Sequence, residues 1–168
     1  MLKPVISGIN KYLLPTTFLV FSGLLYAQPQ LSLELSSATQ ITTEQQGKVI
    51  TTYEATDTTV PGDKLAYTIA FHNVGDEAAI NASLVGTIPK QATFLKTLVV
   101  PTQTTVRFSI DNGDSYHLPP LTTTVVNAQG ETVTQEVGAE TYTHIRFTLR
   151  APIEPKASGS LSYLIQIK

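Results

Sequence analysis

The sequence contains no cysteine, which excludes disulfide cross-links and thiol chemistry. It also lacks tryptophan, and only 14% of its 168 residues are charged, against roughly 25% in an average soluble protein. A domain without disulfides must be held together by its hydrophobic core, which a chain of this length can build. The formal net charge is −2 and no cluster of basic residues is visible. This composition favours one domain and argues against a nucleic-acid-binding protein.

The first 27 residues differ from the rest. Lys3 and Lys11 supply positive charge, residues 12–25 are mostly apolar, and the small residue Ala27 closes a cleavage site. This order is typical of a secretory signal peptide, which is removed on export. A retained membrane anchor is the alternative, but the apolar segment is interrupted and shorter than the ~20 residues that span a bilayer. We therefore predict that residues 28–168 are exported to the periplasm or the cell surface, without stable membrane insertion.

Alternation of apolar and polar residues recurs along the rest of the chain. Leu65, Tyr67, Ile69 and Phe71 are spaced by two, which is the period of a strand with one buried face. The same period occurs in residues 31–36, 80–88, 106–110, 143–149 and 161–167. No segment beyond the signal peptide keeps the 3.6-residue period of a helix. We predict an all-β, two-layer antiparallel β-sandwich of about seven to nine strands.

Turn residues separate these runs. Asn-Gly within residues 111–114 and Asn127-Ala128-Gln129-Gly130 both indicate hairpins. Residues 38–59 are polar and weakly patterned, and we expect them to form a hairpin excursion between the first two core strands. The sequence shows no internal repeat, so residues 28–168 are predicted to be one domain.

The turns on either side of the strand at residues 64–72 resemble the sequence signature of a known family. The turn Pro61-Gly62-Asp63 precedes this strand, and Asn73-Val74-Gly75 follows it. With Tyr67-Thr68 at the strand centre, the pattern resembles the signature of the DUF11 domain, a conserved repeat domain of bacterial envelope proteins. Three later blocks are also similar to that family, namely Ile88-Pro89, residues 108–113 and residues 142–147.

The resemblance covers nearly all of residues 31–168. It implies an immunoglobulin-like sandwich that is exported to the envelope, usually as a spacer or an interaction module, with no catalytic residues. The sequence departs from the family at Gly86-Thr87, in the final turn at residues 155–159, and in the additional residues 38–59. We interpret these departures as loop variation.

Residues that carry chemistry form no recognised motif. There is no Gly-x-Ser-x-Gly nucleophile elbow. His72, His117 and His144 are too widely spaced for a metal signature, although His72 and His144 would come together if their strands paired. A calcium loop at residues 111–114 would need a glutamate where Pro119 stands. We therefore predict no enzyme, no catalytic or metal-binding residue, and no cofactor.

Two hypotheses about function follow. The first is a non-enzymatic interaction module that pairs an exposed sheet edge with a strand of an envelope or surface protein. The last run, which contains Leu161, Tyr163, Ile165 and Ile167, is the predicted edge. The second is a periplasmic small-ligand or carbohydrate-binding module. Its predicted contacts are turn acids and three tyrosines near loops: Tyr53, Tyr116 and Tyr142.

Overall fold

The structure is a computed structural model that describes residues 29–56 and 58–168. The predicted signal peptide, residues 1–27, lies outside these residues. Regular structure in the described residues is strand, apart from one short 3-10 helix, η1 (Ala139–Thr141). No helix in this part of the chain is long and apolar enough to cross a membrane.

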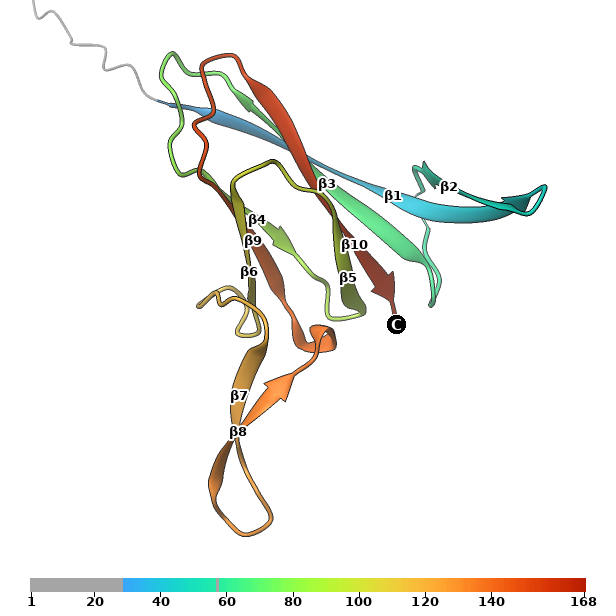
Figure 1. The fold of residues 1–168 in the computed structure, drawn as a ribbon, viewed down its shortest axis with the longest axis vertical. Helices are drawn as coiled ribbons and strands as arrows, with labels where there is room; N and C mark the ends of the chain where they lie inside the picture. The colour runs from blue at the N-terminus through green and yellow to red at the C-terminus, as the bar shows by residue number, and fades with distance from the viewer. Residues whose placement is uncertain (1–28, 57) are drawn as a thin grey trace, which may run out of the picture.

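Ten strands form three antiparallel sheets (Figure 1). A five-stranded sheet has the order β2-β1-β3-β10-β5, a three-stranded sheet has the order β4-β9-β6, and β7 and β8 form a separate hairpin. The strands are β1 (Leu31–Gln45), β2 (Lys48–Glu54), β3 (Lys64–Asn73), β4 (Ser83–Thr87), β5 (Ala92–Val99), β6 (Thr104–Ser109), β7 (Leu121–Val126), β8 (Thr132–Val137), β9 (His144–Leu149) and β10 (Ser158–Ile167).

Seven of these strands form a sandwich, and this confirms the predicted all-β fold. Strands β1-β3-β10-β5 lie over β4-β9-β6, which is the four-over-three arrangement of a constant-type immunoglobulin domain. The connections between the strands differ from those of an immunoglobulin domain. Strands β6, β9 and β10 lie where that domain has its strands G, F and E, whereas an immunoglobulin chain forms these strands in the order E, F and G. The domain is therefore immunoglobulin-like in its layers.

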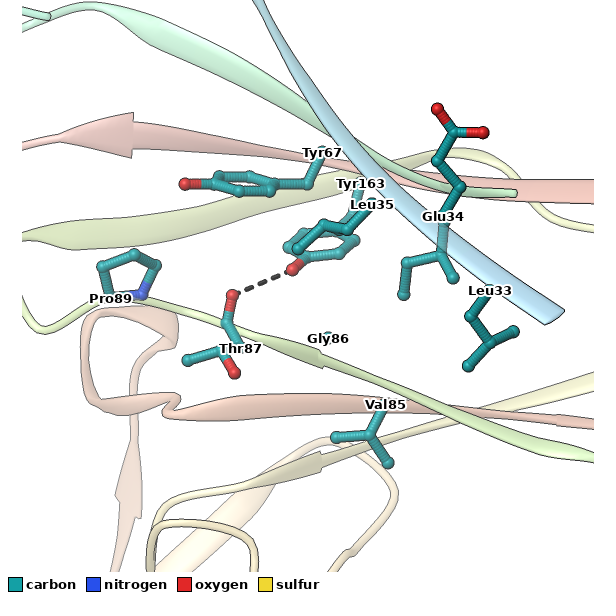
Figure 2. Close-up of a pocket in the computed structure, with 10 residues that line it drawn as sticks. Leu33, Glu34, Leu35, Tyr67, Val85, Gly86, Thr87, Pro89 and Tyr163 are labelled. Carbon is teal, nitrogen blue, oxygen red and sulfur yellow. Dashed lines mark hydrogen bonds between the residues drawn. The ribbon is translucent and has the colours of Figure 1, made fainter. Parts of the chain in front are cut away.

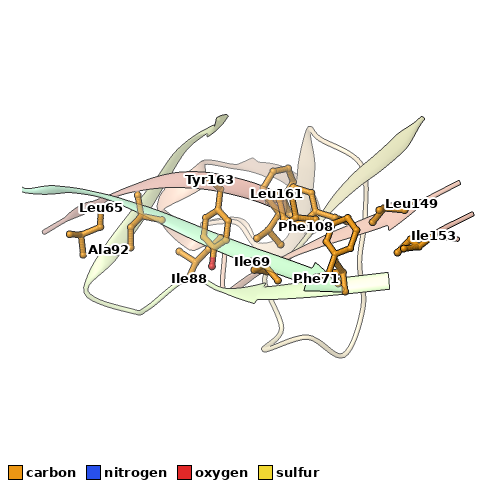
Figure 3. Packing of buried hydrophobic residues seen from close by; sticks show 14 of the residues in the cluster. Leu65, Ile69, Phe71, Ile88, Ala92, Phe108, Leu149, Ile153, Leu161 and Tyr163 are labelled. Carbon is orange, nitrogen blue, oxygen red and sulfur yellow. The ribbon is translucent and has the colours of Figure 1, made fainter. Parts of the chain in front are cut away.

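The hydrophobic core lies between the two layers (Figure 3). Side chains at alternate positions of β3, β9 and β10 fill it, as the period-two pattern predicts. Aromatic contacts join the layers, since Phe94 of β5 packs edge-on against Phe108 of β6 with 4.8 Å between ring centroids. Phe147 of β9 likewise lies 6.3 Å from Tyr163 of β10. These contacts place β5 over β6 and β10 over β9.

The prediction that the last strand is a sheet edge is wrong. Strand β10 lies between β3 and β5, and Leu161, Tyr163 and Ile165 are at most 1% exposed, while Ile167 packs against the core. The physical reason is visible at Leu164, which points to the opposite side of the strand and is only 2% exposed. Ser162 on that same side is only 5% exposed, so the strand is buried on both faces although one face is largely polar, and such burial suits a central position.

Both predicted hairpins outside the core are present. Strand β1 continues beyond its core part and turns at Gln46-Gly47, where both residues have positive φ (53° and 73°), into β2. This turn has the backbone signature of type I′, which matches the twist of a hairpin. Val125 and Val133 lie opposite each other in the β7–β8 hairpin. Both hairpins extend away from the sandwich (Figure 1).

The expected hairpin at residues 111–114 is only partly formed. The chain does reverse there, but the returning segment makes a single bridge, in which Phe108 pairs with His117. Strand β6 pairs instead with β9 along its whole length. Local turn chemistry at Asn112-Gly113 therefore sets the reversal, whereas the tertiary structure selects the partner strand.

The motif residue Asn73 ties together three segments at the end of β3. Its side chain is fully buried, and its amide donates to the carbonyls of Glu77 (2.7 Å) and Ile153 (2.8 Å). Its Oδ1 accepts from the N–H groups of Gly75 (3.1 Å) and Gln30 (3.4 Å). Asparagine is suited to this position because it has both donors and acceptors on one short side chain.

The other motif turn, Pro61-Gly62-Asp63, starts β3. Gly62 has φ of 97°, and the Asp63 N–H donates to the Val60 carbonyl, which is the geometry of a turn with proline at its second position and glycine at its third. The Asp63 carboxylate accepts from the Val60 N–H at 2.8 Å and closes the turn. The Gly62 N–H donates to the Ile167 carbonyl, so the turn is also tied to β10.

We predict that Asn73→Ala strongly destabilises the fold. The substitution leaves the Glu77 carbonyl and the buried Gly75 N–H without these partners, and the Ile153 carbonyl keeps only its bond from the Ala79 N–H. A buried polar group left unpaired costs about 1–3 kcal/mol. A loss of about 2–4 kcal/mol in the free energy of unfolding is expected in urea titrations. Asn127→Ala, which alters only the β7–β8 turn, is the control and should cost much less. Equal loss in both variants would contradict the bridging role.

Candidate functional site: a groove between β1 and β4

The two layers of the sandwich differ in width, and this leaves one strand without a partner layer. Strand β1 lies beside β3 at the side where the three-stranded sheet ends with β4. At the opposite side of the sandwich the two layers are aligned strand over strand, with β5 over β6 and β10 over β9. In the described residues, no strand of the smaller sheet lies beyond β4, so β1 overhangs.

Two leucines of β1 point into the space below this overhang. Leu33 lies opposite Phe71 and Leu35 opposite Ile69 in the β1–β3 ladder, so both leucines are on the core side of the sheet. The partners on β3 are buried, but Leu33 is 55% exposed and Leu35 is 64% exposed. The sequence pattern correctly assigns these leucines to the inner face, and their exposure results from the missing strand.

The overhang forms an apolar groove of about 250 Å³ between β1 and β4 (Figure 2). Leu33 and Leu35 form one wall, and the β4 backbone forms the other. Tyr67, Ile69 and Tyr163 line the floor. In Figure 2 the side chain of Val85 points away from the groove, so β4 contributes mainly its main chain.

Tyr163 in the floor is held in place by its contacts with Tyr67 and Thr87. Its ring stacks on Tyr67 with 5.7 Å between centroids, and its hydroxyl donates to the Thr87 carbonyl at 2.8 Å. A Cβ atom at Gly86 would lie only 2.6 Å from the Tyr163 ring, so glycine is needed here for close approach. Strand β4 is thereby fastened to β10 across the core.

Burial, with a smaller contribution from neighbouring Tyr67, raises the pKa of Tyr163 well above its ordinary value. The phenol therefore stays protonated and keeps donating to Thr87 in strongly alkaline solution. Its hydrogen bond fixes the position of the groove wall, and we assign it no role in a reaction.

The groove is flanked by an unpaired strand edge on β4. The Leu149 N–H donates to the Ala82 carbonyl and the Ile88 N–H to the Thr143 carbonyl, so even-numbered residues of β4 face β9. Hydrogen-bonding direction alternates along a strand, so Ser83, Val85 and Thr87 direct their main-chain groups away from β9. The Thr87 carbonyl is occupied by Tyr163, and in the described residues no strand pairs with the groups of Ser83 and Val85.

The neighbouring part of β1 has a free edge as well. Strand β2 pairs with β1 only from Thr39 onward, which leaves residues 31–38 unpaired on that side within the described chain. The groove therefore combines apolar side chains with two rows of free main-chain donors and acceptors. This combination suits an extended peptide segment, since such a segment supplies both alternating side chains and a main chain.

The histidines do not come together. His72 lies on β3 and its Nδ1 is 2.8 Å from the Ser158 hydroxyl, whereas His144 lies on β9 in the other sheet. The idea that His72 and His144 meet through strand pairing is therefore wrong. Within residues 29–56 and 58–168, no group of three potential metal ligands is present.

The turn acid Asp111 is used locally. The hydroxyls of Ser109 and Ser115 each donate to its carboxylate at 2.6 Å, and the Ser115 N–H adds a third bond at 3.0 Å. The hydrogen bond from Ser109, followed by those from Ser115, holds the pKa of Asp111 well below its usual range. This network closes the turn after β6, and it explains the acid at this position without a ligand.

The three loop tyrosines lie in different environments. Tyr53 is 46% exposed on the β1–β2 hairpin. The guanidinium of Arg146 covers the Tyr116 ring at 4.1 Å from its centroid, and Tyr142 packs against Phe94 and Phe108. A carbohydrate-stacking surface made of these three residues is not formed.

Searches against protein-family models, curated proteins and solved structures find no match to this chain. The resemblance to DUF11 therefore remains a prediction from the sequence blocks, and the groove must be interpreted from its own geometry.

We predict that Tyr163 makes the fold sensitive to alkali. Its pKa is raised in the folded state, so the unfolded chain loses this proton first, at about pH 10. Above that pH the folded state binds more protons, and the free energy of unfolding falls by up to about 1.4 kcal/mol per pH unit. Tyr163→Phe should be less stable at pH 7 but should show a shallower decline between about pH 10 and 12 in urea titrations. A decline of identical slope in both proteins would contradict this assignment.

Proposed function

We propose that the protein is an exported, non-enzymatic interaction module that binds an extended segment of a partner envelope or surface protein between β1 and β4. The observation that carries this proposal is the exposure of Leu33 and Leu35 on the inner face of the sandwich, beside the unpaired edge of β4. Export and the envelope setting rest on the predicted signal peptide and on the resemblance to DUF11, whose members are envelope proteins.

The partner segment is proposed to add to β4, as a fourth strand of the smaller sheet. A strand in that position would lie opposite β1 and would cover Leu33 and Leu35, whereas a strand added to β1 would only widen the overhang. Its main chain would pair with the outward groups of Ser83 and Val85. Side chains at alternate positions would enter the groove.

The expected binding energy is moderate. Complete burial of a leucine side chain contributes about 1.5–3 kcal/mol. Because Leu33 is 55% exposed and Leu35 is 64% exposed, covering both contributes roughly 2–4 kcal/mol. Each new main-chain hydrogen bond adds a net of about 0.5–1.5 kcal/mol. A segment of five or six residues would thus bind reversibly, and a longer interface would strengthen the complex.

We predict that the double variant Leu33→Asn/Leu35→Asn loses partner binding while keeping its stability. Both side chains are already more than half exposed, so the fold should tolerate the change. A photoreactive amino acid placed at position 85 in the full-length protein is used to crosslink and identify the partner in cells. Binding of that purified partner by the double variant should be at least about tenfold weaker.

The matched control is Val126→Asn, which removes a 70% exposed apolar residue from the β7–β8 hairpin. This variant should bind the partner normally. A second test is Val85→Pro, which removes an outward N–H from β4 without affecting the hydrogen bonds to β9. The proposed groove would be refuted if Leu33→Asn/Leu35→Asn and Val85→Pro both bound the partner normally and had unchanged melting curves.

A further inference from the structure

The outer face of the three-stranded sheet carries charge of the opposite sign to the whole chain, whose formal net charge is −2. Side chains that alternate with the buried residues of β4, β9 and β6 point outward from this sheet. None of them is acidic. They are Ser83, Val85, Thr87, His144, Arg146, Thr148, Thr105 and Arg107.

Two arginines are neighbours at the centre of this face. Arg107 of β6 and Arg146 of β9 are directly opposite in the antiparallel ladder. Like charges at such positions repel each other and destabilise the strand pair unless an anion lies between them. Among the described residues, neither guanidinium forms a salt bridge with a carboxylate, since the ion pair that is present joins Lys156 to Asp76.

The guanidinium of Arg146 is held by an aromatic ring. It lies 4.1 Å from the centroid of the Tyr116 ring, and its Nε is buried without a hydrogen-bond partner. Stacking on Tyr116 fixes the plane of the guanidinium and does not consume its terminal N–H groups. Thr105 and Thr148 are the next residues on the same face of the two strands, and the Thr148 hydroxyl lies 3.1 Å from the Ser83 hydroxyl.

The acidic side chain next to this face does not neutralise the arginines. Asp111 contacts Ser109 at the end of β6, but its two oxygens already accept hydrogen bonds from Ser109 and Ser115. The remaining ionisable group on this face is His144, whose Nδ1 is 3.2 Å from the Thr143 hydroxyl. The two positive charges are therefore left for a group from outside the domain.

We propose that Arg107 and Arg146 form a binding site for a phosphoryl group, carried either by a small phosphate monoester or by a lipid headgroup. A phosphate monoester carries about −1.5 to −2 charges at pH 7, which matches two guanidinium groups, whereas a carboxylate would neutralise only one. Each guanidinium presents parallel N–H donors with the spacing of phosphate oxygens. This site lies on β9 and β6, apart from the groove at β1 and β4, and does not depend on the proposed partner segment.

The experiment follows the arginine Nε–H and backbone amide NMR signals while inorganic phosphate is added to the exported protein in about 0.15 M sodium chloride, an ionic strength that screens weak surface attraction. We expect shifts confined to residues around Arg107 and Arg146. Arg107→Gln should weaken phosphate binding about tenfold or more. Arg150→Gln, which removes an exposed arginine at the end of β9, is the control and should leave the affinity unchanged.

Arg146→Gln should also weaken binding, and its melting curve shows whether loss of the Tyr116 contact has disturbed the fold. Glycerol phosphate and vesicles of phosphatidylcholine with 20 mol% phosphatidic acid, about one charged lipid in five, distinguish the two sources of the phosphoryl group. If the protein binds glycerol phosphate or the vesicles, and Arg107→Gln abolishes that binding, the site is supported. The probe that binds then identifies the source of the phosphoryl group.

Two results would overturn the proposal. The first is a phosphate response that is spread over all basic residues and is unchanged in Arg107→Gln, because this indicates an adventitious ion only. The second is an equal response to sodium acetate at the same concentration, since the site would then recognise carboxylates and not phosphoryl groups.

Discussion

A four-stranded layer packed on a three-stranded layer leaves one strand of the wider layer without a cover. In this protein that strand is β1, and Leu33 and Leu35 are consequently exposed on the face that would otherwise be core. The same mismatch leaves the outer edge of β4 unpaired within the described residues. The candidate site is therefore a consequence of how the layers align, since its apolar wall and its free main-chain groups have one common cause.

The groove is also bounded by contacts that resist deformation. The hydroxyl of Tyr163 holds the Thr87 carbonyl, and Gly86 lets the tyrosine ring approach the β4 backbone closely. At the other end of β3, Asn73 connects the strand to residues 77 and 153 through a fully buried side chain. Strands β1, β3 and β4 are in this way fixed relative to one another, so the groove is largely formed before any partner binds. A preformed site loses little conformational entropy on binding.

The two proposed sites use opposite chemistry on neighbouring parts of one small domain. The groove presents apolar side chains and strand edges, which suit a polypeptide. The face around Arg107 and Arg146 presents paired positive charges and hydroxyl groups, which suit an oxyanion. Strand β4 connects them, because its inner side borders the groove and Val85 on its outer side lies next to Arg146. A segment bound in the proposed groove would leave the outward side chains of Arg107 and Arg146 uncovered, because they lie on the other side of the smaller sheet.

Sequence patterns predicted much of the fold because they report local requirements. Alternating residues such as Leu65, Ile69 and Phe71 define the core face of a strand, and the turn residues Pro61, Gly62 and Asn73 define where strands begin and end. The β7–β8 hairpin was predicted for the same reason, since its turn residue Gly130 has positive φ, whereas the β1–β2 hairpin was expected because residues 38–59 are polar and weakly patterned. These features depend on a few adjacent residues, and the period of the side chains is sufficient to recognise them.

The sequence by itself therefore determined the class of fold and the inner faces of the alternating strands, but β5 was not predicted, because its residues show no clear period and its pairing with β10 is irregular. Only the tertiary structure decided which strands lie at the edges and which inward residues remain uncovered. Leu33 and Leu161 have the same alternating context, yet one is 55% exposed and the other is fully buried, because strand order depends on pairing between segments far apart in the chain. The meeting of Arg107 with Arg146 depends on the same long-range pairing, which no local pattern records.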